Sequence, residues 1–182
     1  TYKMYYKIAK IIEDNPEFDT TAGSKAIINY ETLHPHNISQ KTAIMLEHFM
    51  NVTRHKIGGR AKAMVVTPSR LHAVRYVQEF KRQIKEKLDS LQDEKVQLTQ
   101  QIETFEKIYN DYKDALSKLA NPDLTDEQLA QVRAILAKID EELDKYGFPK
   151  EELEERLNNA KNALTNVDKA ITQTVEALKG LD

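Results

Sequence analysis

The sequence predicts a mostly helical chain: one or a few buried strands come first, and a long antiparallel helical bundle or coiled-coil module follows. Three observations support this fold class. Residues 64–66 form an unbroken apolar run, as in a strand covered on both faces. From Ile84 onward, apolar residues recur every three or four positions, which is the spacing of a heptad seam. Charge divides the chain near the same point, and we place a domain boundary between residues 83 and 84, where the heptad seam begins.

The first part of the chain is basic and the second part is acidic, so the two parts are expected to bind different partners. Residues 1–85 hold 14 of the 27 Lys and Arg and 7 of the 29 Asp and Glu, a net +7, and the rest of the chain is net −9. We expect the first part to be able to meet phosphates and the second part to avoid them. The absence of cysteine fits a reducing cytoplasm, and no apolar run approaches the roughly 18–20 residues that span a bilayer. No secretory signal opens the chain, and the first residue is Thr, which suggests a fragment.

Residues before the apolar run predict three short helices. The first covers residues 3–13 and ends at Asn15-Pro16, and the second covers residues 25–33 and ends at His34-Pro35. Asn37 is a reasonable cap for the third, which continues to Phe49. His34 and His36 flank a proline, but no carboxylate or cysteine nearby completes a metal site, so we predict no metal.

A basic loop with two glycines follows at residues 55–62. It carries Lys56 and Arg60, and cationic loops with open backbone N–H groups suit phosphate binding. A pair of glycines without further pattern is more often a flexible turn, and that interpretation stays open.

The stretch from residue 61 to residue 80 organises the first part. We predict a buried strand at residues 61–67, stopped by Pro68, which has no N–H to donate. Ser69 is then expected to cap a helix beginning at Arg70. One face of that helix should pack back on the strand, while the basic side chains stay wetter; the packing face is Leu71, Val74, Val77 and Ile84, and the basic residues are Arg70, Arg75, Lys81 and Arg82. Strand-to-helix units bind ligands at the strand's C-terminal end, although an ordinary connection is the plainer alternative.

The second part predicts three seamed helices. The first continues the helix from Arg70 without interruption over about 50 residues and ends at Asn121-Pro122. Thr125 and Gln128 form a capping-box start for the next helix, Gly147 is expected just after its C-cap, and Pro149 suits the first turn of the last helix. The predicted seams are Ile84, Leu88, Leu91, Leu98, Ile102, Phe105, Tyr109, Tyr112, Leu116 and Leu119; Leu129, Val132, Leu136, Ile139, Leu143 and Tyr146; and Leu153, Leu157, Ala160, Leu164, Val167, Ile171 and Leu178. Short connections favour an antiparallel hairpin or a three-helix bundle.

Specific motifs in the first part resemble a known family. Residues 34–41 read H-P-H-N-I-S-Q-K, residues 47–49 read E-H-F, and residues 58–76 contain G-G-R-A-K-A-M-V-V-T-P-S-R followed by A-V-R-Y. This stretch, residues 29–80, is similar to the R (restriction, HsdR-type) subunit of type I restriction enzymes. The K-A-M-V-V-T-P-S-R block resembles helicase motif IV, which in that family belongs to the second RecA-like lobe of the motor.

The resemblance implies a parent that is an ATP-dependent DNA translocase and endonuclease, a type I site-specific deoxyribonuclease, with ATP and Mg as cofactors. Its implied partners are double-stranded DNA and the modification and specificity subunits, with no membrane. The phosphate loop, the acidic motif of the first lobe and the nuclease constellation are not found here, so we predict no catalytic residues and no activity for this fragment alone. Residues matched to the family's nucleic-acid-facing edge are Thr67, Ser69 and Arg70. Further candidates for DNA or phosphate contact are Arg75, Lys41, Lys56 and Arg60.

A second hypothesis gives the function to the helices. The helical module would then be a structural or subunit-docking element with no nucleic-acid role, and the first part would only anchor it. After Phe80 the chain enters heptads where the family would continue its lobe, and the sequence leaves open whether this is an insertion or a truncation product.

Overall fold

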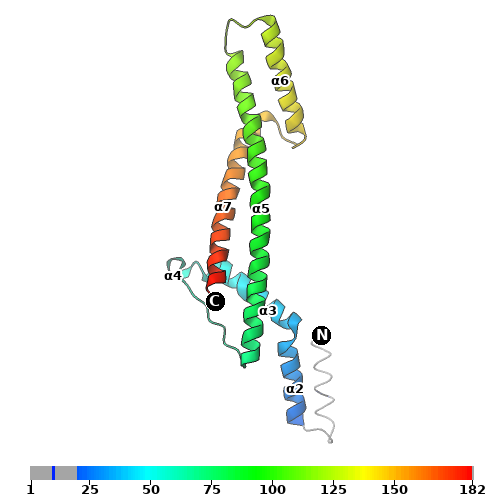
Figure 1. Cartoon of the computed structure of the whole chain (residues 1–182), viewed down its shortest axis with the longest axis vertical. Helices are drawn as coiled ribbons and strands as arrows, with labels where there is room; N and C mark the ends of the chain where they lie inside the picture. The colour runs from blue at the N-terminus through cyan, green and yellow to red at the C-terminus, as the bar shows by residue number, and fades with distance from the viewer. Residues whose placement is uncertain (1–9, 11–19, 182) are drawn as a thin grey trace. The chain divides into compact units, whose positions relative to one another are not determined.

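The computed structural model describes residue 10 and residues 20–181, and helices make up most of them (Figure 1). The helix expected at residues 3–13 lies outside the described residues except for Lys10. The elements, in order, are α2 (Thr20–Leu33), α3 (Pro35–His48), the π-helix η1 (Phe49–Thr53), α4 (Lys56–Gly59), α5 (Arg70–Leu119), α6 (Asp126–Asp144), the 3₁₀-helix η2 (Lys150–Glu152) and α7 (Leu153–Lys179).

The chain divides into two units at residues 86 and 87. The first unit contains the chain up to Glu86 together with the residues from Gly180 onward, and the second runs from Lys87 to Lys179. The long helix α5 was expected to be continuous over about 50 residues, and this prediction is confirmed: it contains 50 residues and contributes to both units.

The junction of α2 and α3 falls at the predicted proline. His34 has extended backbone angles, Pro35 occupies the first turn of α3, and the His34 Nδ1 accepts a hydrogen bond of 3.2 Å from the His36 N–H. The cap is therefore His34 and not Asn37 as predicted. Proline is well placed at the first helical position because its φ is preset and its missing N–H would be unpaired there. The Asn37 side chain instead donates to the Glu31 carbonyl at 3.0 Å.

The buried strand predicted at residues 61–67 is not formed. This segment has no regular secondary structure, and the exposed fractions of Met64 and Val66 are 87% and 82%. A strand is held by ladder hydrogen bonds to a neighbouring strand. No residue in the described part of the chain is in a strand, so the apolar run has no ladder to join.

The helix face predicted to cover that strand is also open. Leu71, Val74 and Val77 are 50%, 53% and 40% exposed, so the prediction that they pack on the strand is wrong for this structure. Ile84, the fourth residue of the same face, is buried at 3%. The apolar residues 64–66, before the connection, and the α5 face of Leu71, Val74 and Val77, after it, are therefore both exposed to solvent.

Polar bonds join α3 to α5 in the first unit. The Gln83 amide donates to the Ser39 carbonyl at 2.9 Å, and the Arg82 guanidinium reaches the Ser39 hydroxyl at 3.5 Å. Arg82 was predicted to be exposed to solvent. Its side chain is 49% exposed, and it also forms ion pairs with Glu79 and Glu86. These contacts fix the rotation of α5 against α3.

The short helix α4 contains two left-handed residues. Ile57 has φ 54° and Gly58 has φ 64°, and the Arg60 N–H donates to the Ile57 carbonyl at 3.4 Å. Glycine adopts this conformation freely, whereas a β-branched residue is strained by roughly 1–2 kcal/mol. The loop predicted at residues 55–62 is therefore a tight turn with a defined backbone.

In the second unit α6 begins as the sequence predicts, whereas α7 is preceded by a short 3₁₀-helix. Thr125 and Gln128 form a complete capping box at the start of α6, with bonds of 3.1 Å and 3.3 Å. Gly147 follows the C-cap Lys145 by two residues, has φ 75°, and donates to the Leu143 carbonyl at 3.1 Å. Pro149 is the N-cap of η2, which leads directly into α7.

Two ion pairs show that α7 runs antiparallel to α5. Lys95 pairs with Asp168 at 2.7 Å, and Glu106 pairs with Lys161 at 2.7 Å, so positions rise along α5 as they fall along α7. Within this unit, α6 lies against the end of α5 and α7 lies farther back along it (Figure 1). This arrangement matches the predicted antiparallel hairpin, with three helices meeting only at the joint.

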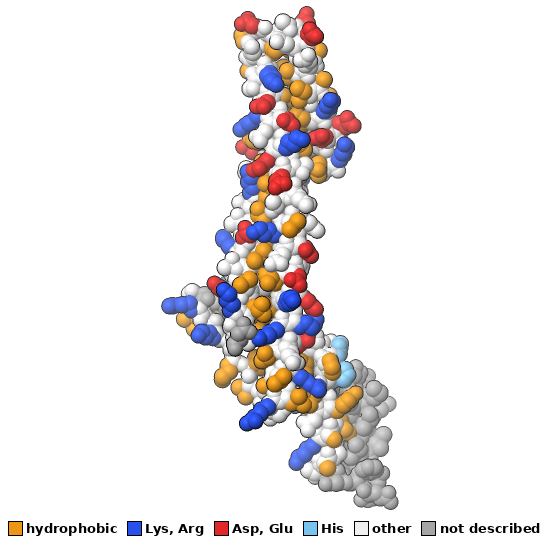
Figure 2. All heavy atoms as spheres, viewed as in Figure 1, with side chains coloured by type: hydrophobic (Ala, Val, Ile, Leu, Met, Phe, Trp, Pro, Cys, Tyr) orange, Lys and Arg blue, Asp and Glu red, His pale blue; other side chains and the backbone are white. Residues whose placement is uncertain are grey.

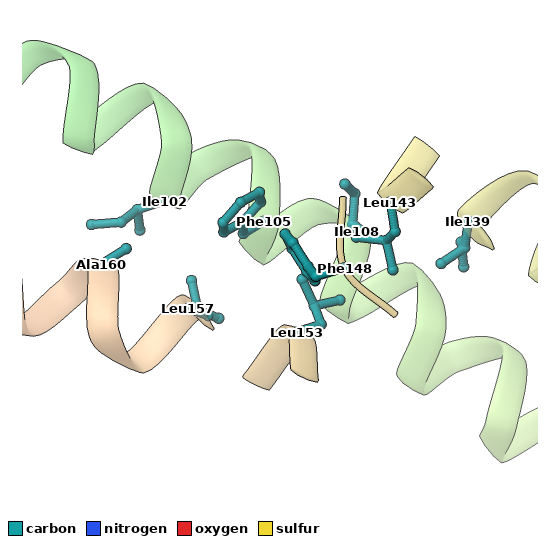
Figure 3. Close-up of a cluster of buried hydrophobic side chains, with 9 residues drawn as sticks. All are labelled: Ile102, Phe105, Ile108, Ile139, Leu143, Phe148, Leu153, Leu157 and Ala160. Atoms are coloured by element: carbon teal, nitrogen blue, oxygen red, sulfur yellow. The ribbon is translucent and has the colours of Figure 1, made fainter. Parts of the chain in front are cut away.

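The core of the second unit lies at that joint (Figure 3). Ile102 and Phe105 of α5 face Leu157 and Ala160 of α7, while Ile108 lies toward α6. The nine buried residues are Ile102, Phe105, Ile108, Ile139, Leu143, Phe148, Leu153, Leu157 and Ala160. Phe105 meets Phe148 and Tyr146 edge-on at centroid distances of 5.5 Å and 5.2 Å. Each large side chain buried in this way stabilises the fold by roughly 1.5–3 kcal/mol.

The seam along α5 departs from the predicted heptad after Phe105. Ile108 and Ala115 are buried at 4% and 1%, while Leu116 is 43% exposed. A straight α-helix drifts by about 20° per heptad, so the covered face moves away from a strict seven-residue repeat. The change comes where α6 replaces α7 as the neighbour of α5.

No helix among the described residues combines the length and the apolar character that crossing a membrane would require.

Candidate nucleic-acid interface

The turn that starts α5 is closed by its own side chains. The Ser69 hydroxyl accepts the His72 backbone N–H at 3.3 Å, and the Ser69 carbonyl accepts the Ala73 N–H at 3.1 Å, which confirms Ser69 as the predicted cap. The Thr67 hydroxyl donates to the Ser69 carbonyl at 3.1 Å. Both motif hydroxyls therefore take part in holding the turn.

Beneath this turn lies His72, which the sequence analysis did not single out. It is buried at 4%; its Nδ1 is 2.8 Å from the Ser69 Oγ, and its Nε2 is 2.9 Å from the Thr32 Oγ1 of α2. A histidine three residues after an N-cap serine was the available signal, because this position faces the cap side chain. Its partner on α2 could not be found from local sequence.

The arginines of the site have different surroundings. Arg70, at the first position of α5, is exposed. Arg75, also a predicted contact, donates from its guanidinium to the Leu33 carbonyl at the end of α2. A cation there satisfies an open carbonyl and offsets the negative end of the helix. Arg75 thus joins α2 to α5, and Arg70 points its charge to solvent.

The remaining candidates lie on other elements of the first unit. Lys41 is exposed on α3, and Lys56 and Arg60 are exposed on and beside α4. Figure 2 shows Lys and Arg side chains beside apolar ones around α4 and the start of α5. Among the described residues, no hydrogen bond or ion pair links Lys41, Lys56 or Arg60 to the Ser69 turn.

A charged network lies farther along α5. The Glu79 carboxylate accepts from the Arg82 Nε at 2.8 Å and from the Gln83 amide at 2.7 Å. The Arg82 hydrogen bond is the main cause that lowers the pKa of Glu79 to about 2, and the same pairing raises the pKa of Arg82. This arginine is committed to its carboxylate neighbours, which leaves it unsuited to binding a phosphate.

The arrangement suits one kind of chemistry. An α-helix N-terminus with a solvent-facing guanidinium favours an anion, and phosphate is a natural ligand for that pair. In the part of the chain that the structure describes, His, Asp and Glu do not gather in groups of three that could hold a metal ion.

Comparison of the chain with protein-family models, curated proteins and solved structures found no match.

Proposed function

We propose that this chain is a non-catalytic fragment of a type I restriction enzyme R subunit, which when intact is an ATP-dependent DNA translocase and endonuclease. In this proposal residues 61–67, which form no strand in this chain, become a strand of the second RecA-like lobe only in the intact subunit, where the start of α5 covers it. ATP and Mg belong to the intact protein. Duplex DNA and the modification and specificity subunits are its partners.

One observation carries the proposal. Residues 64–66 and the α5 face of Leu71, Val74 and Val77 are both apolar and both exposed, and only residues 67–69 separate the segment from α5. A strand followed by a helix buries its apolar residues when it joins further strands in a sheet and the helix packs on one face of that sheet. The sequence resemblance supports such a sheet, since the K-A-M-V-V-T-P-S-R block resembles helicase motif IV of a second RecA-like lobe.

The DNA contact is proposed at the turn between these two elements. Arg70 presents a guanidinium at the N-terminus of α5, and the first unit as a whole carries the positive share of the charge. Contacts of this kind bind the phosphate backbone and carry no sequence information. Lys41, Lys56 and Arg60, which are exposed on other elements of the first unit, are proposed as further phosphate contacts.

The test is binding of a short mixed-sequence duplex at low salt, followed by fluorescence anisotropy. We expect weak binding whose affinity falls steeply with salt, and a clear further loss in Arg70→Glu. Lys107→Glu is the matched control, because it makes the same charge change at an exposed position of α5 in the acidic second unit. Unchanged affinity in Arg70→Glu would remove this residue from the site.

A second candidate function is a structural or subunit-docking module, and the second unit favours it. This unit builds its own core of nine buried residues from α5, α6, α7 and the connection between α6 and η2 that holds Phe148. Melting at several chain concentrations distinguishes its two forms: an intermolecular coiled coil melts at a higher temperature as concentration rises, whereas a bundle within one chain does not. If the chain binds the modification and specificity subunits but binds no duplex DNA, this function is favoured over the first.

A further inference from the structure

His72 forms a buried hydrogen-bonded relay between α2 and the start of α5. Its ring is 4% exposed, and each ring nitrogen is within 2.9 Å of a hydroxyl oxygen, Ser69 on one side and Thr32 on the other. A neutral imidazole has one N–H donor and one bare nitrogen. The positions of three protons, one on each member of the relay, are therefore linked.

Thr32 determines the direction of the relay. Its hydroxyl has a single proton, and the Ile28 carbonyl accepts it at 2.8 Å, the bond that threonine commonly makes one turn back in a helix. The Thr32 oxygen is then the acceptor for the His72 Nε2–H. With the ring proton on Nε2, Nδ1 is bare, so the Ser69 O–H donates to it.

We propose that His72 is a positioning residue that keeps the Ser69 hydroxyl proton inside the protein, so that a phosphate at this turn is bound through Arg70 and not through the Ser69 side chain. This inference rests on the proposed function and refines its site. The Thr67 proton is likewise taken by the Ser69 carbonyl. Arg70 is exposed, and no polar contact of its side chain is found within the described residues.

The relay also couples the turn to α2. Thr32 and the carbonyl of Leu33 are adjacent on α2, and both are held by α5, through His72 and Arg75. Loss of His72 therefore loosens the cap and the end of α2 together.

The first experiment reads the ring protons directly. Two-bond and three-bond ¹H–¹⁵N correlation spectra of the ¹⁵N-labelled full chain, with His72 assigned by comparison with His72→Gln, should show a protonated Nε2 and a bare Nδ1. Thr32→Val removes the acceptor and should mix the two tautomers, while Thr32→Ser keeps the hydroxyl and should restore the wild-type pattern. A wild-type ring protonated on Nδ1 would overturn the relay.

The second experiment separates the two motif residues in DNA binding. The slope of log affinity against log salt should fall by about one in Arg70→Gln and stay unchanged in Ser69→Gly, which removes the hydroxyl and remains an acceptable N-cap. An equal fall in Ser69→Gly would overturn the assignment to Arg70. If the wild-type chain binds no duplex, both the proposed function and this phosphate contact are wrong. The hydrogen-bonded relay is tested separately, by the tautomer of the His72 ring.

Discussion

The two units of the chain reach order by different means. The second unit buries aromatic and aliphatic side chains between its own helices, and its ion pairs, such as Lys95 with Asp168, lie at the edge of that core. The first unit joins its helices largely through polar contacts, such as His72 with Thr32 and Gln83 with Ser39, and leaves much of its apolar surface exposed. A heptad pattern needs only a second helix to cover it, whereas a strand pattern needs a sheet.

The comparison is tested most severely by placing a carboxylate on the apolar face of α5 in each unit. Ile102 is 8% exposed and Val74 is 53% exposed. Ile102→Asp should destabilise the second unit by about 4 kcal/mol or more, since losing a core isoleucine costs roughly 2–5 kcal/mol and the buried charge adds to it. Val74→Asp should change stability by less than about 0.5 kcal/mol. Urea unfolding followed by circular dichroism measures both.

Val96→Asp is the control for this pair, because Val96 is 55% exposed on the same helix within the second unit. It should behave like Val74→Asp. If Val74→Asp proved as costly as Ile102→Asp, the start of α5 would be covered in solution and the contrast between the units would fail.

A smaller effect is expected from the one buried polar side chain of α3 that is left unsatisfied among the described residues. Thr42 is fully buried at 0% exposed, and its hydroxyl has no hydrogen-bond partner. A buried unpaired hydroxyl costs roughly 1–3 kcal/mol, so Thr42→Val should raise the free energy of unfolding by about 1 kcal/mol. Thr42→Ser keeps the hydroxyl and loses a methyl group, and it should lower the stability. A destabilised Thr42→Val in the same denaturation assay would show that the hydroxyl does find a partner.

The smallest effect concerns pH and the charged network on α5. The pKa of Glu79 in the folded chain is lowered to about 2 from its ordinary value of 4.5, mainly by the Arg82 hydrogen bond. A group whose folded pKa is depressed stabilises the fold above its unfolded pKa, and this contribution is lost as pH falls from 4.5 towards 2. Glu79→Gln should therefore flatten the change in unfolding midpoint between about pH 6 and about pH 3. Because the pair is partly exposed, we expect a modest difference; identical profiles for the two proteins would contradict it.

How much of this could be read from the sequence depended on how local each signal was. The capping box of Thr125 and Gln128, the Ser69 cap and the end of α2 before Pro35 each involve neighbours within a few residues, and the structure confirms all three. The strand at residues 61–67 was predicted from its apolar run, but its hydrogen-bond partners would have to come from elsewhere, and the described residues hold no strand. The roles proposed for Arg70, Lys41, Lys56 and Arg60 stay predictions.

The site itself shows the same limit. Sequence placed Thr67, Ser69 and Arg70 together because they lie within four residues of one another along the chain. It did not find His72, whose partner Thr32 is 40 residues away, or the commitment of Arg75 to the Leu33 carbonyl. Long-range polar pairs depend on how two helices meet, and no periodicity encodes that.

The sequence by itself determined the long helices α5, α6 and α7 and the antiparallel return of the second unit, because propensity, capping and apolar spacing act over a few residues at a time. Only the tertiary structure decided which apolar faces are covered. It moved the seam from Leu116 to Ala115 where α6 takes over from α7, and it left Met64 and Val66 in solvent. Burial depends on a second surface in the right place, and where it is present in this chain, that surface comes from residues far along the sequence.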